Sequence, residues 1–152
     1  MNTLETKLAT LGYTLPEPSA PVANYVPYVI VGSLIFVAGQ IPTAQGQMRY
    51  TGPVSSDNLE AGQEAAKLCA LNILAQVKAA AGDLSRIRRC VRLCGYIQSH
   101  ADFSQQSVIM DTASNLMVDL FGEAGRHART SISCIALPRN AMVEIDAIFE
   151  MQ

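Results

Sequence analysis

The chain has 152 residues, of which 49% are hydrophobic and only 16% are charged. This length predicts a single domain over residues 1–152, and the low charge density leaves surface for contacts between subunits. Because the net charge is -2 and no basic cluster dominates, nucleic acid is not an expected partner. No apolar run approaches the ~18–20 residues of a membrane span, and no signal peptide opens the chain. We therefore expect a cytoplasmic protein without a membrane partner.

The first 24 residues predict a short helix followed by an extended connector. Over residues 3–11, three leucines recur on one helical face, and Gly12 can end the helix. The sequence LPEPSAP at residues 15–21 contains three prolines, which favour extended backbone.

Residues 25–39 are rich in β-branched and aromatic side chains, with Gly32-Ser33 in the middle. This pattern predicts a β-hairpin with a two-residue turn. Residues 40–56 contain two glycines and two prolines and are expected to form a loop, with at most a short strand near residues 48–50.

Two helices and a strand are predicted in the centre of the chain. Residues 57–81 are rich in good helix formers, and Asp57 and Glu60 have the spacing of a capping box. Residues 88–98 are predicted to form a strand. A second helix is expected over residues 104–121, where apolar side chains recur on one face.

Two strands, 129–136 and 141–149, are predicted to close the chain as a hairpin around the turn at 137–140. Four residues of the last strand share an apolar face suited to cover by helices: Val143, Ile145, Ala147 and Phe149. The other face is mixed and should meet water or another subunit: Met142, Glu144, Asp146, Ile148 and Glu150. Long helices alternating with hairpins predict an α+β fold, with two main helices on one face of a mixed sheet.

Arg129 and Glu144 place opposite charges on the two predicted C-terminal strands. One interpretation is a solvent-facing ion pair across the hairpin, which would stabilise by only ~0.2–1 kcal/mol. The other is that Arg129 binds an anionic ligand through its guanidinium, while a nearby carboxylate orients a water or moves a proton. The spacing alone leaves both interpretations open.

The chain contains four cysteines: Cys69, Cys90, Cys94 and Cys134. None forms a CxxC pair, and the two histidines, His100 and His127, do not supply close partners for a zinc site. We expect the cysteines to be small buried residues, and we expect no metal site.

Two sequence blocks resemble the RidA/YjgF family, also known as endoribonuclease L-PSP or translation inhibitor. The first is GSLIFVAGQIP at residues 32–42, and the second is ARTSISCIALPRNAMVEIDAIF at residues 128–149. The second block is similar to the family's C-terminal signature and is the more specific. The resemblance covers about residues 25–150, and the longer N-terminus suggests a divergent subgroup.

The resemblance implies the chorismate-mutase-like α+β fold. It also implies a homotrimer, with the sheets in the centre, the helices outside and the active sites in clefts between neighbouring subunits. The mixed face of the last strand would then partly line subunit contacts.

Relatives of the RidA type hydrolyse reactive enamines and imines, such as 2-aminoacrylate, to 2-keto acids and ammonia without a cofactor. The resemblance implies three catalytic residues in this chain. Arg129 would hold the substrate carboxylate, Glu144 would orient the attacking water, and the backbone carbonyl of Ser131 would help to hold that water.

The resemblance also implies four ligand-binding residues. Tyr25 would sit in the wall of the cleft, and Ala38 and Gly39 would offer backbone contacts beneath a 2-imino or 2-keto acid. Ser114 could replace an asparagine that archetypal members carry in the second helix, and Asn115 is the alternative. Archetypal members also have serine where this chain has Ala38.

Three functions fit these residues. The first is an enamine/imine deaminase. The second is a non-catalytic trimer that binds small carboxylates or acts as a regulator, which would need Arg129 but not Glu144. The third, an endoribonuclease or translation inhibitor, rests on the family's name alone, because no pair of histidines occupies the matched motif positions.

Overall fold

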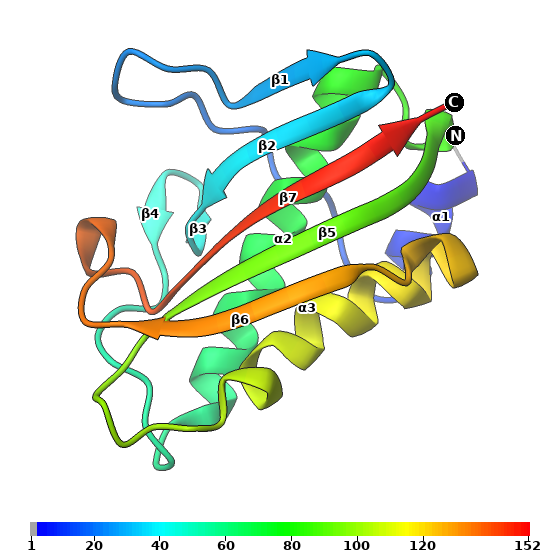
Figure 1. The fold of residues 1–152 in the computed structure, drawn as a ribbon. Coiled ribbons are helices and arrows are strands. Elements are labelled where there is room, and N and C mark those ends of the chain that lie inside the picture. Colours follow the sequence, from blue (N-terminus) through cyan, green and yellow to red (C-terminus); the bar gives the residue numbers. More distant parts are fainter. Residues whose placement is uncertain (1–2) are drawn as a thin grey trace.

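Two long helices cover one face of a five-stranded sheet in the computed structural model of the chain, which describes residues 3–152 (Figure 1). The sheet contains β1 (Tyr28–Val31), β2 (Leu34–Gln40), β5 (Ile87–Gln98), β6 (Ala128–Cys134) and β7 (Val143–Met151). The helices are α1 (Thr3–Thr10), α2 (Leu59–Ala81) and α3 (Gln106–Phe121). Short elements join them: β3 (Thr43–Ala44), β4 (Gln47–Met48), η1 (Leu84–Arg86), η2 (Gly122–Gly125) and η3 (Pro138–Asn140). This arrangement confirms the predicted α+β architecture.

The strand order is β1-β2-β7-β5-β6, and only β5 and β6 are parallel. The predicted C-terminal hairpin is therefore wrong, because β5 lies between β6 and β7. The physical reason is α3, which carries the chain back along the sheet and so places β6 parallel to β5, as a crossover connection does. Strand β7 then pairs antiparallel with the other side of β5.

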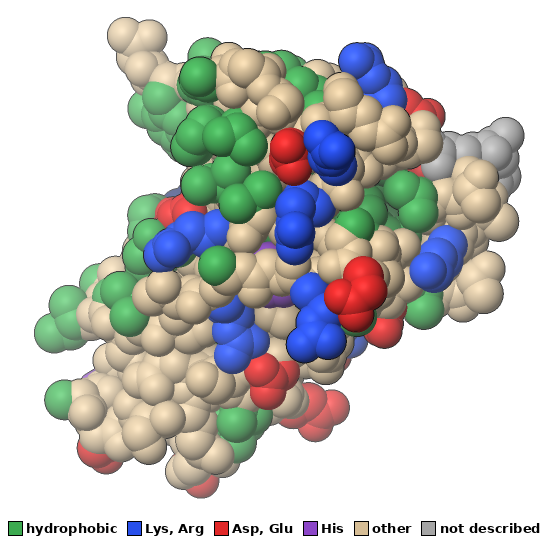
Figure 2. Space-filling view, turned by 45° about the vertical axis from the view of Figure 1, so that its right-hand side comes forward, with side chains coloured by type: hydrophobic (Ala, Val, Ile, Leu, Met, Phe, Trp, Pro, Cys, Tyr) green, Lys and Arg blue, Asp and Glu red, His purple; other side chains and the backbone are tan. Residues whose placement is uncertain are grey.

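The apolar face of β7 lies against the helices, as predicted. Val143, Ile145, Ala147 and Phe149 are all at most 2% exposed. Phe149 also meets Phe121 at the end of α3 edge to face, with ring centroids 6.2 Å apart. The opposite, open face of the sheet is half-exposed along β7, and Figure 2 shows exposed hydrophobic side chains near Lys and Arg side chains on the surface.

Helix α2 begins one residue later than the capping box predicted. Asn58, and not Asp57, occupies the N-cap position, and it makes no side-chain cap bond. The Asn58 side chain instead accepts a hydrogen bond from the Ser55 backbone N–H at 2.7 Å. This side chain therefore stabilises the preceding turn and does not cap the helix. The helix ends at Gly82, whose φ of 85° suits glycine.

The first hairpin is confirmed, with Val31 opposite Leu34 across the turn at Gly32. A β-bulge then interrupts β2, because three steps from Val37 to Gln40 match two steps on β7. Beyond the bulge, β3 and β4 form a small hairpin, which only partly overlaps the short strand expected near residues 48–50.

The N-terminal segment is packed against the helices. Leu8 of α1 is 1% exposed, and Glu5 forms an ion pair with Lys78 of α2 at 2.7 Å. The extended connector expected after α1 leads from there to β1 (Figure 1).

Candidate functional site

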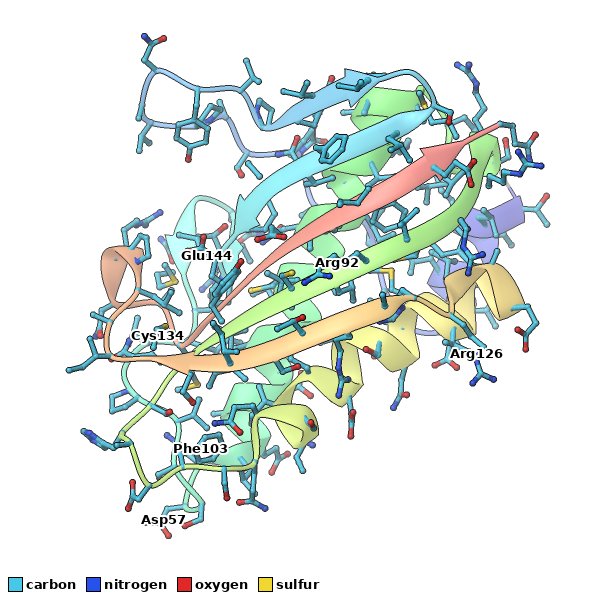
Figure 3. The ribbon with its side chains drawn as sticks, viewed as in Figure 1. Asp57, Arg92, Phe103, Arg126, Cys134 and Glu144 are labelled. Carbon is cyan, nitrogen blue, oxygen red and sulfur yellow. The ribbon has the colours of Figure 1, made fainter. Side chains whose placement is uncertain are left out.

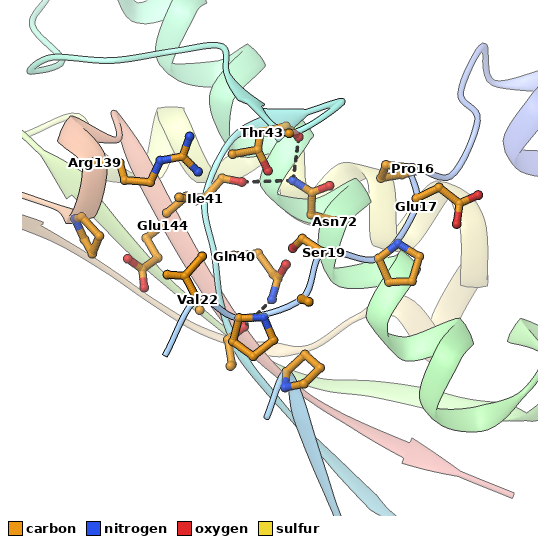
Figure 4. A pocket seen from close by; sticks show the side chains of 18 of the residues that line it. Pro16, Glu17, Ser19, Val22, Gln40, Ile41, Thr43, Asn72, Arg139 and Glu144 are labelled. Carbon is orange, nitrogen blue, oxygen red and sulfur yellow. Dashed lines mark hydrogen bonds between the residues drawn. The ribbon is translucent and has the colours of Figure 1, made fainter. Parts of the chain in front are cut away.

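A cavity of about 950 Å³ lies at the end of the sheet where β2 leaves its bulge (Figure 4). Several parts of the chain line it: the proline-rich segment 16–22, residues 25 and 27 before β1, residues 38–41 of the bulge and its continuation, residues 43–46 of the small hairpin, Asn72 of α2, and residues 138–139. Glu144 of β7 also lines it. The cavity thus brings the N-terminal segment next to residues of both sequence blocks, 32–42 and 128–149.

Glu144 is half-buried, and it lies on the open face of β7 opposite Tyr96 of β5 (Figure 3). Burial raises the pKa of the Glu144 carboxyl, and repulsion from Asp146 adds to the rise. Its carboxylate lies against Gly39, where an added Cβ would overlap Glu144 Oε2. A glycine at position 39 is therefore required for this placement of the carboxylate.

The structure places four of the predicted site residues around this one cavity: Tyr25, Ala38, Gly39 and Glu144. The bulge positions Ala38 and Gly39, since the local change of register turns the strand at that point. Tyr25 precedes β1 and is 55% exposed.

Arg139 also lines this cavity, although sequence analysis did not select it (Figure 4). Arg139 and Asn140 have φ values of 55° and 60°, a left-handed backbone that side chains rarely adopt. Within residues 3–152 the guanidinium of Arg139 forms no ion pair. Its neighbours in sequence gave no sign of this conformation, which depends on the turn from β6 to β7.

Arg129 lies elsewhere, on the helix-covered face of β6. Its Nη1 donates to Asp111 Oδ1 at 2.9 Å and to Ser114 Oγ at 3.1 Å, and both acceptors belong to α3. Of the two interpretations of Arg129, the ion pair across a hairpin is therefore not what the structure shows, because the paired carboxylate is that of Asp111 on α3. Ser114, and not Asn115, is the α3 residue in contact with this guanidinium.

A histidine completes the Arg129 cluster. His127 Nδ1 lies 2.6 Å from the carbonyl oxygen of Gly125, and because a carbonyl only accepts, Nδ1 carries the proton. In the neutral ring Nε2 then accepts from the Ser114 hydroxyl at 2.9 Å. Burial lowers the pKa of His127 and nearby Arg129 adds to this, against the hydrogen bond to Gly125, so the ring is neutral near pH 7.

Ser131 follows Arg129 by two positions on the same face of β6. Its hydroxyl oxygen is buried and has no hydrogen-bond partner within the described part of the chain. A buried polar atom of this kind normally finds a partner. The unpaired hydroxyl lies on the same strand face as the Arg129 guanidinium.

One chain therefore does not bring all the predicted site residues together. Tyr25, Ala38, Gly39 and Glu144 line the cavity, whereas Arg129, Ser131 and Ser114 gather between β6 and α3. The two groups lie on opposite sides of the sheet, so a site containing both needs a second copy of the chain.

The predicted burial of the four cysteines is only partly confirmed. Cys69 and Cys90 are buried, whereas Cys94 and Cys134 are half-exposed. Burial raises the pKa of Cys90 to about 12, which makes that thiol a poor nucleophile. In the described residues, no three His, Cys, Asp or Glu side chains gather closely enough to hold a metal ion, and no helix is long and apolar enough to cross a membrane.

Comparisons with known proteins agree on one family. The model of the family described as "YjgF/chorismate_mutase-like, putative endoribonuclease" matches residues 5–151. Protein TCP17 of Trypanosoma cruzi is 40% identical over 146 residues, which cover 95% of this chain and 91% of that protein.

Solved structures also match this chain over most of its length. The protein Atu1372 from Agrobacterium tumefaciens is 48% identical with a TM-score of 0.91, over 98% of this chain and 92% of that one. A structure from Shewanella oneidensis described as a "putative endoribonuclease" is 38% identical with a TM-score of 0.94, over 99% and 100% of the two chains. Escherichia coli TdcF with bound serine, at 24% identity and a TM-score of 0.65 over 92% and 97%, shares the fold.

Proposed function

Since the chain belongs to the YjgF/RidA family, we propose that it hydrolyses reactive 2-imino acids and their enamine tautomers to 2-keto acids and ammonia. The observation that carries the proposal is the Glu144 carboxylate, half-buried with a raised pKa on the wall of a cavity. A carboxylate in this setting is a stronger base than an exposed one, and so is suited to accept a proton from water near neutral pH.

The proposed reaction needs little covalent chemistry from the protein. A 2-imino acid is already electrophilic, and water adds to the carbon of its C=N bond to give a carbinolamine. That intermediate then loses ammonia and leaves the 2-keto acid. Glu144 takes the proton of the attacking water and returns it to the departing nitrogen. Positioning of the two reactants accounts for most of the expected acceleration.

Arg129 supplies the carboxylate clamp in this proposal, from a neighbouring copy in a homotrimer. Strand β6 is an edge strand, and its exposed apolar side chains suit an interface: Ile132 is 47% exposed and Ile135, just beyond the strand, is 91% exposed. A second copy seated against this edge would bring its cavity to Arg129, with the Ser131 carbonyl close to the attacking water.

The relatives also support a small ligand with a carboxylate. The structure of TdcF contains serine, a small amino acid that carries a carboxylate, as the proposed substrates do. An arginine fork binds such a carboxylate through two charge-assisted hydrogen bonds. The proposed chemistry requires no cofactor.

A non-catalytic carboxylate-binding or regulatory trimer is the second candidate, and one observation favours it. Arg129 is already held by Asp111 and Ser114 of its own chain. If the guanidinium binds a carboxylate without leaving that cluster on α3, the ligand stays away from Glu144 and is bound without turnover. An endoribonuclease, the activity named for the family and for some solved structures, has less support here, because His127 is held by Ser114 and Gly125.

Ammonia release tests the proposal directly. A pyridoxal-phosphate dehydratase acting on serine generates 2-aminoacrylate, and the purified chain at micromolar concentration should accelerate the release of ammonia from it. The dehydratase alone gives the background rate. A rate equal to that background, with a folded protein that still binds pyruvate, would favour the second candidate.

A further inference from the structure

We propose that the proline-rich segment 16–22 is a specificity wall, which makes the Glu144 cavity select acids with an extended apolar side chain over three-carbon acids. The assignment of those acids as 2-imino and 2-keto acids rests on the proposed function. The selection by side-chain size rests on the shape and chemistry of the cavity.

The wall is fixed to the body of the protein by a buried hydrogen bond. The side-chain amide of Gln76 on α2 is only 1% exposed, and its Nε2 donates to the backbone oxygen of Ser19 at 2.8 Å. A buried amide left without this partner would be costly. Two further contacts hold the part of the chain that precedes the segment, the Glu5–Lys78 ion pair and Lys67 over the ring of Tyr13 at 5.5 Å.

The wall is mostly apolar where it lines the cavity. It contributes Pro16, Pro18, Ala20, Pro21 and Val22. Prolines present ring carbons and carry no backbone N–H, so this side of the cavity offers few donors to a polar ligand. The facing side adds further apolar residues: Pro27, Ala38, Ile41 and Ala44.

Charge is concentrated at one end of the cavity. Arg139 and Glu144 lie together there, whereas the Glu17 carboxylate lies at the other end and points away from them (Figure 4). A ligand that matches this distribution has a polar, acidic head near Arg139 and Glu144 and an apolar tail along the wall. A cavity of about 950 Å³ is at the upper end of the range for drug-sized ligands, ~300–1,000 Å³, so a three-carbon acid leaves the wall without contact.

Calorimetric titration with a series of 2-keto acids tests the inference, because these are stable products of the proposed reaction. The series is pyruvate, 2-oxobutanoate, 4-methyl-2-oxopentanoate and phenylpyruvate. Each buried methylene should tighten binding about fourfold, so we expect 4-methyl-2-oxopentanoate to bind at least about tenfold more tightly than pyruvate. Equal affinities across the series would overturn the inference, as would no binding of any member.

Two variants assign the selectivity to the wall. Ala20 is exposed, and Ala20→Trp should narrow the cavity. The long acids should then bind no more tightly than pyruvate, while pyruvate itself still binds. Ala101→Trp, in an exposed loop outside the cavity lining, controls for the added indole. Selectivity unchanged in Ala20→Trp would contradict the inference.

The second variant, Gln76→Leu, removes the hydrogen bond that holds the wall at Ser19. We expect its preference for long acids over pyruvate to fall towards the preference of Ala20→Trp. Gln63→Leu is the matched control, because Gln63 of α2 makes a comparable bond to the Val108 backbone oxygen at 3.3 Å away from the wall. If Gln76→Leu and Gln63→Leu reduce selectivity equally, the effect comes from a general loss of packing and not from release of the wall.

The outcome separates the inference from the proposed function. Faster ammonia release with equal rates for short and long imino acids would support the deaminase and overturn the specificity wall. Tighter binding of long 2-keto acids without faster ammonia release would leave the wall in place and overturn the deaminase.

Discussion

Arg129 and Glu144 point to opposite faces of the same sheet, with β5 between their strands. Arg129 pairs with Leu93, which is buried under the helices, whereas Glu144 pairs with Tyr96 on the open face. The two groups that the proposed chemistry needs therefore do not meet within one chain. An assembly that places β6 of one copy beside the cavity of the next would resolve this separation.

The ion pair between Arg129 and Asp111 leads to the first prediction. Asp111→Asn should strengthen the binding of 2-keto acids, because the carboxylate competes with the ligand for the guanidinium. The Asp111 side chain is 56% exposed, and exposed pairs are worth ~0.2–1 kcal/mol, which corresponds to a gain of at most about fivefold. Titration of pyruvate into both proteins measures it. Weaker binding in the variant would mean that Asp111 orients Arg129 for the ligand.

Glu144→Gln should separate binding from turnover. The amide keeps the shape of the side chain but does not accept the proton of water at neutral pH, so ammonia release should fall by ~10²–10⁴-fold. The affinity for 2-keto acids should change little, since the proposal assigns the substrate carboxylate to Arg129. A variant that keeps most of its ammonia release would remove Glu144 from the mechanism.

The same substitution has a predicted effect on stability that depends on pH. Because burial raises the pKa of Glu144, the folded chain binds this proton more tightly than the unfolded chain does. The stability that this proton contributes is complete below the ordinary value of 4.5, and it is lost as pH rises through the raised pKa. Glu144→Gln should therefore gain in Tm over the wild type as pH rises from about 4 to about 8. A Tm difference that is constant with pH would contradict this.

Gly39→Ala should displace the Glu144 carboxylate, because the added Cβ would overlap it. We expect a loss of ammonia release comparable to that of Glu144→Gln, with the same far-ultraviolet circular dichroism as the wild type. The double variant should then be no worse than either single one, since both changes remove the same group. Additive losses would show that Gly39 acts independently of Glu144.

Much of the fold could be predicted because it depends on local patterns. The turn at Gly32 and the alternation along β7 are properties of neighbouring residues, and both are present. The position of β6 could not be predicted in the same way, because it depends on the crossover through α3, which no short stretch of sequence encodes.

The same distinction holds for the candidate site. The motif resemblance selected Gly39 and Glu144, which lie against each other. It did not select Arg139, whose left-handed backbone lies in the turn from β6 to β7. Nor did it select the proline-rich wall, which Gln76 of α2 holds at the cavity by a tertiary contact. Both features depend on contacts between residues that lie far apart in the sequence.

Mixing two inactive variants tests the central claim that the site is assembled between copies. Arg129→Ala and Glu144→Gln should each lose ammonia release when purified alone. When both variants are co-expressed, mixed assemblies form. An interface that joins the intact Arg129 of one copy to the intact Glu144 of the next should release ammonia. For random mixing about a quarter of the wild-type activity should return. If the mixed assemblies stay as inactive as either parent while wild-type assemblies release ammonia, the two residues do not act across an interface, and the account is contradicted.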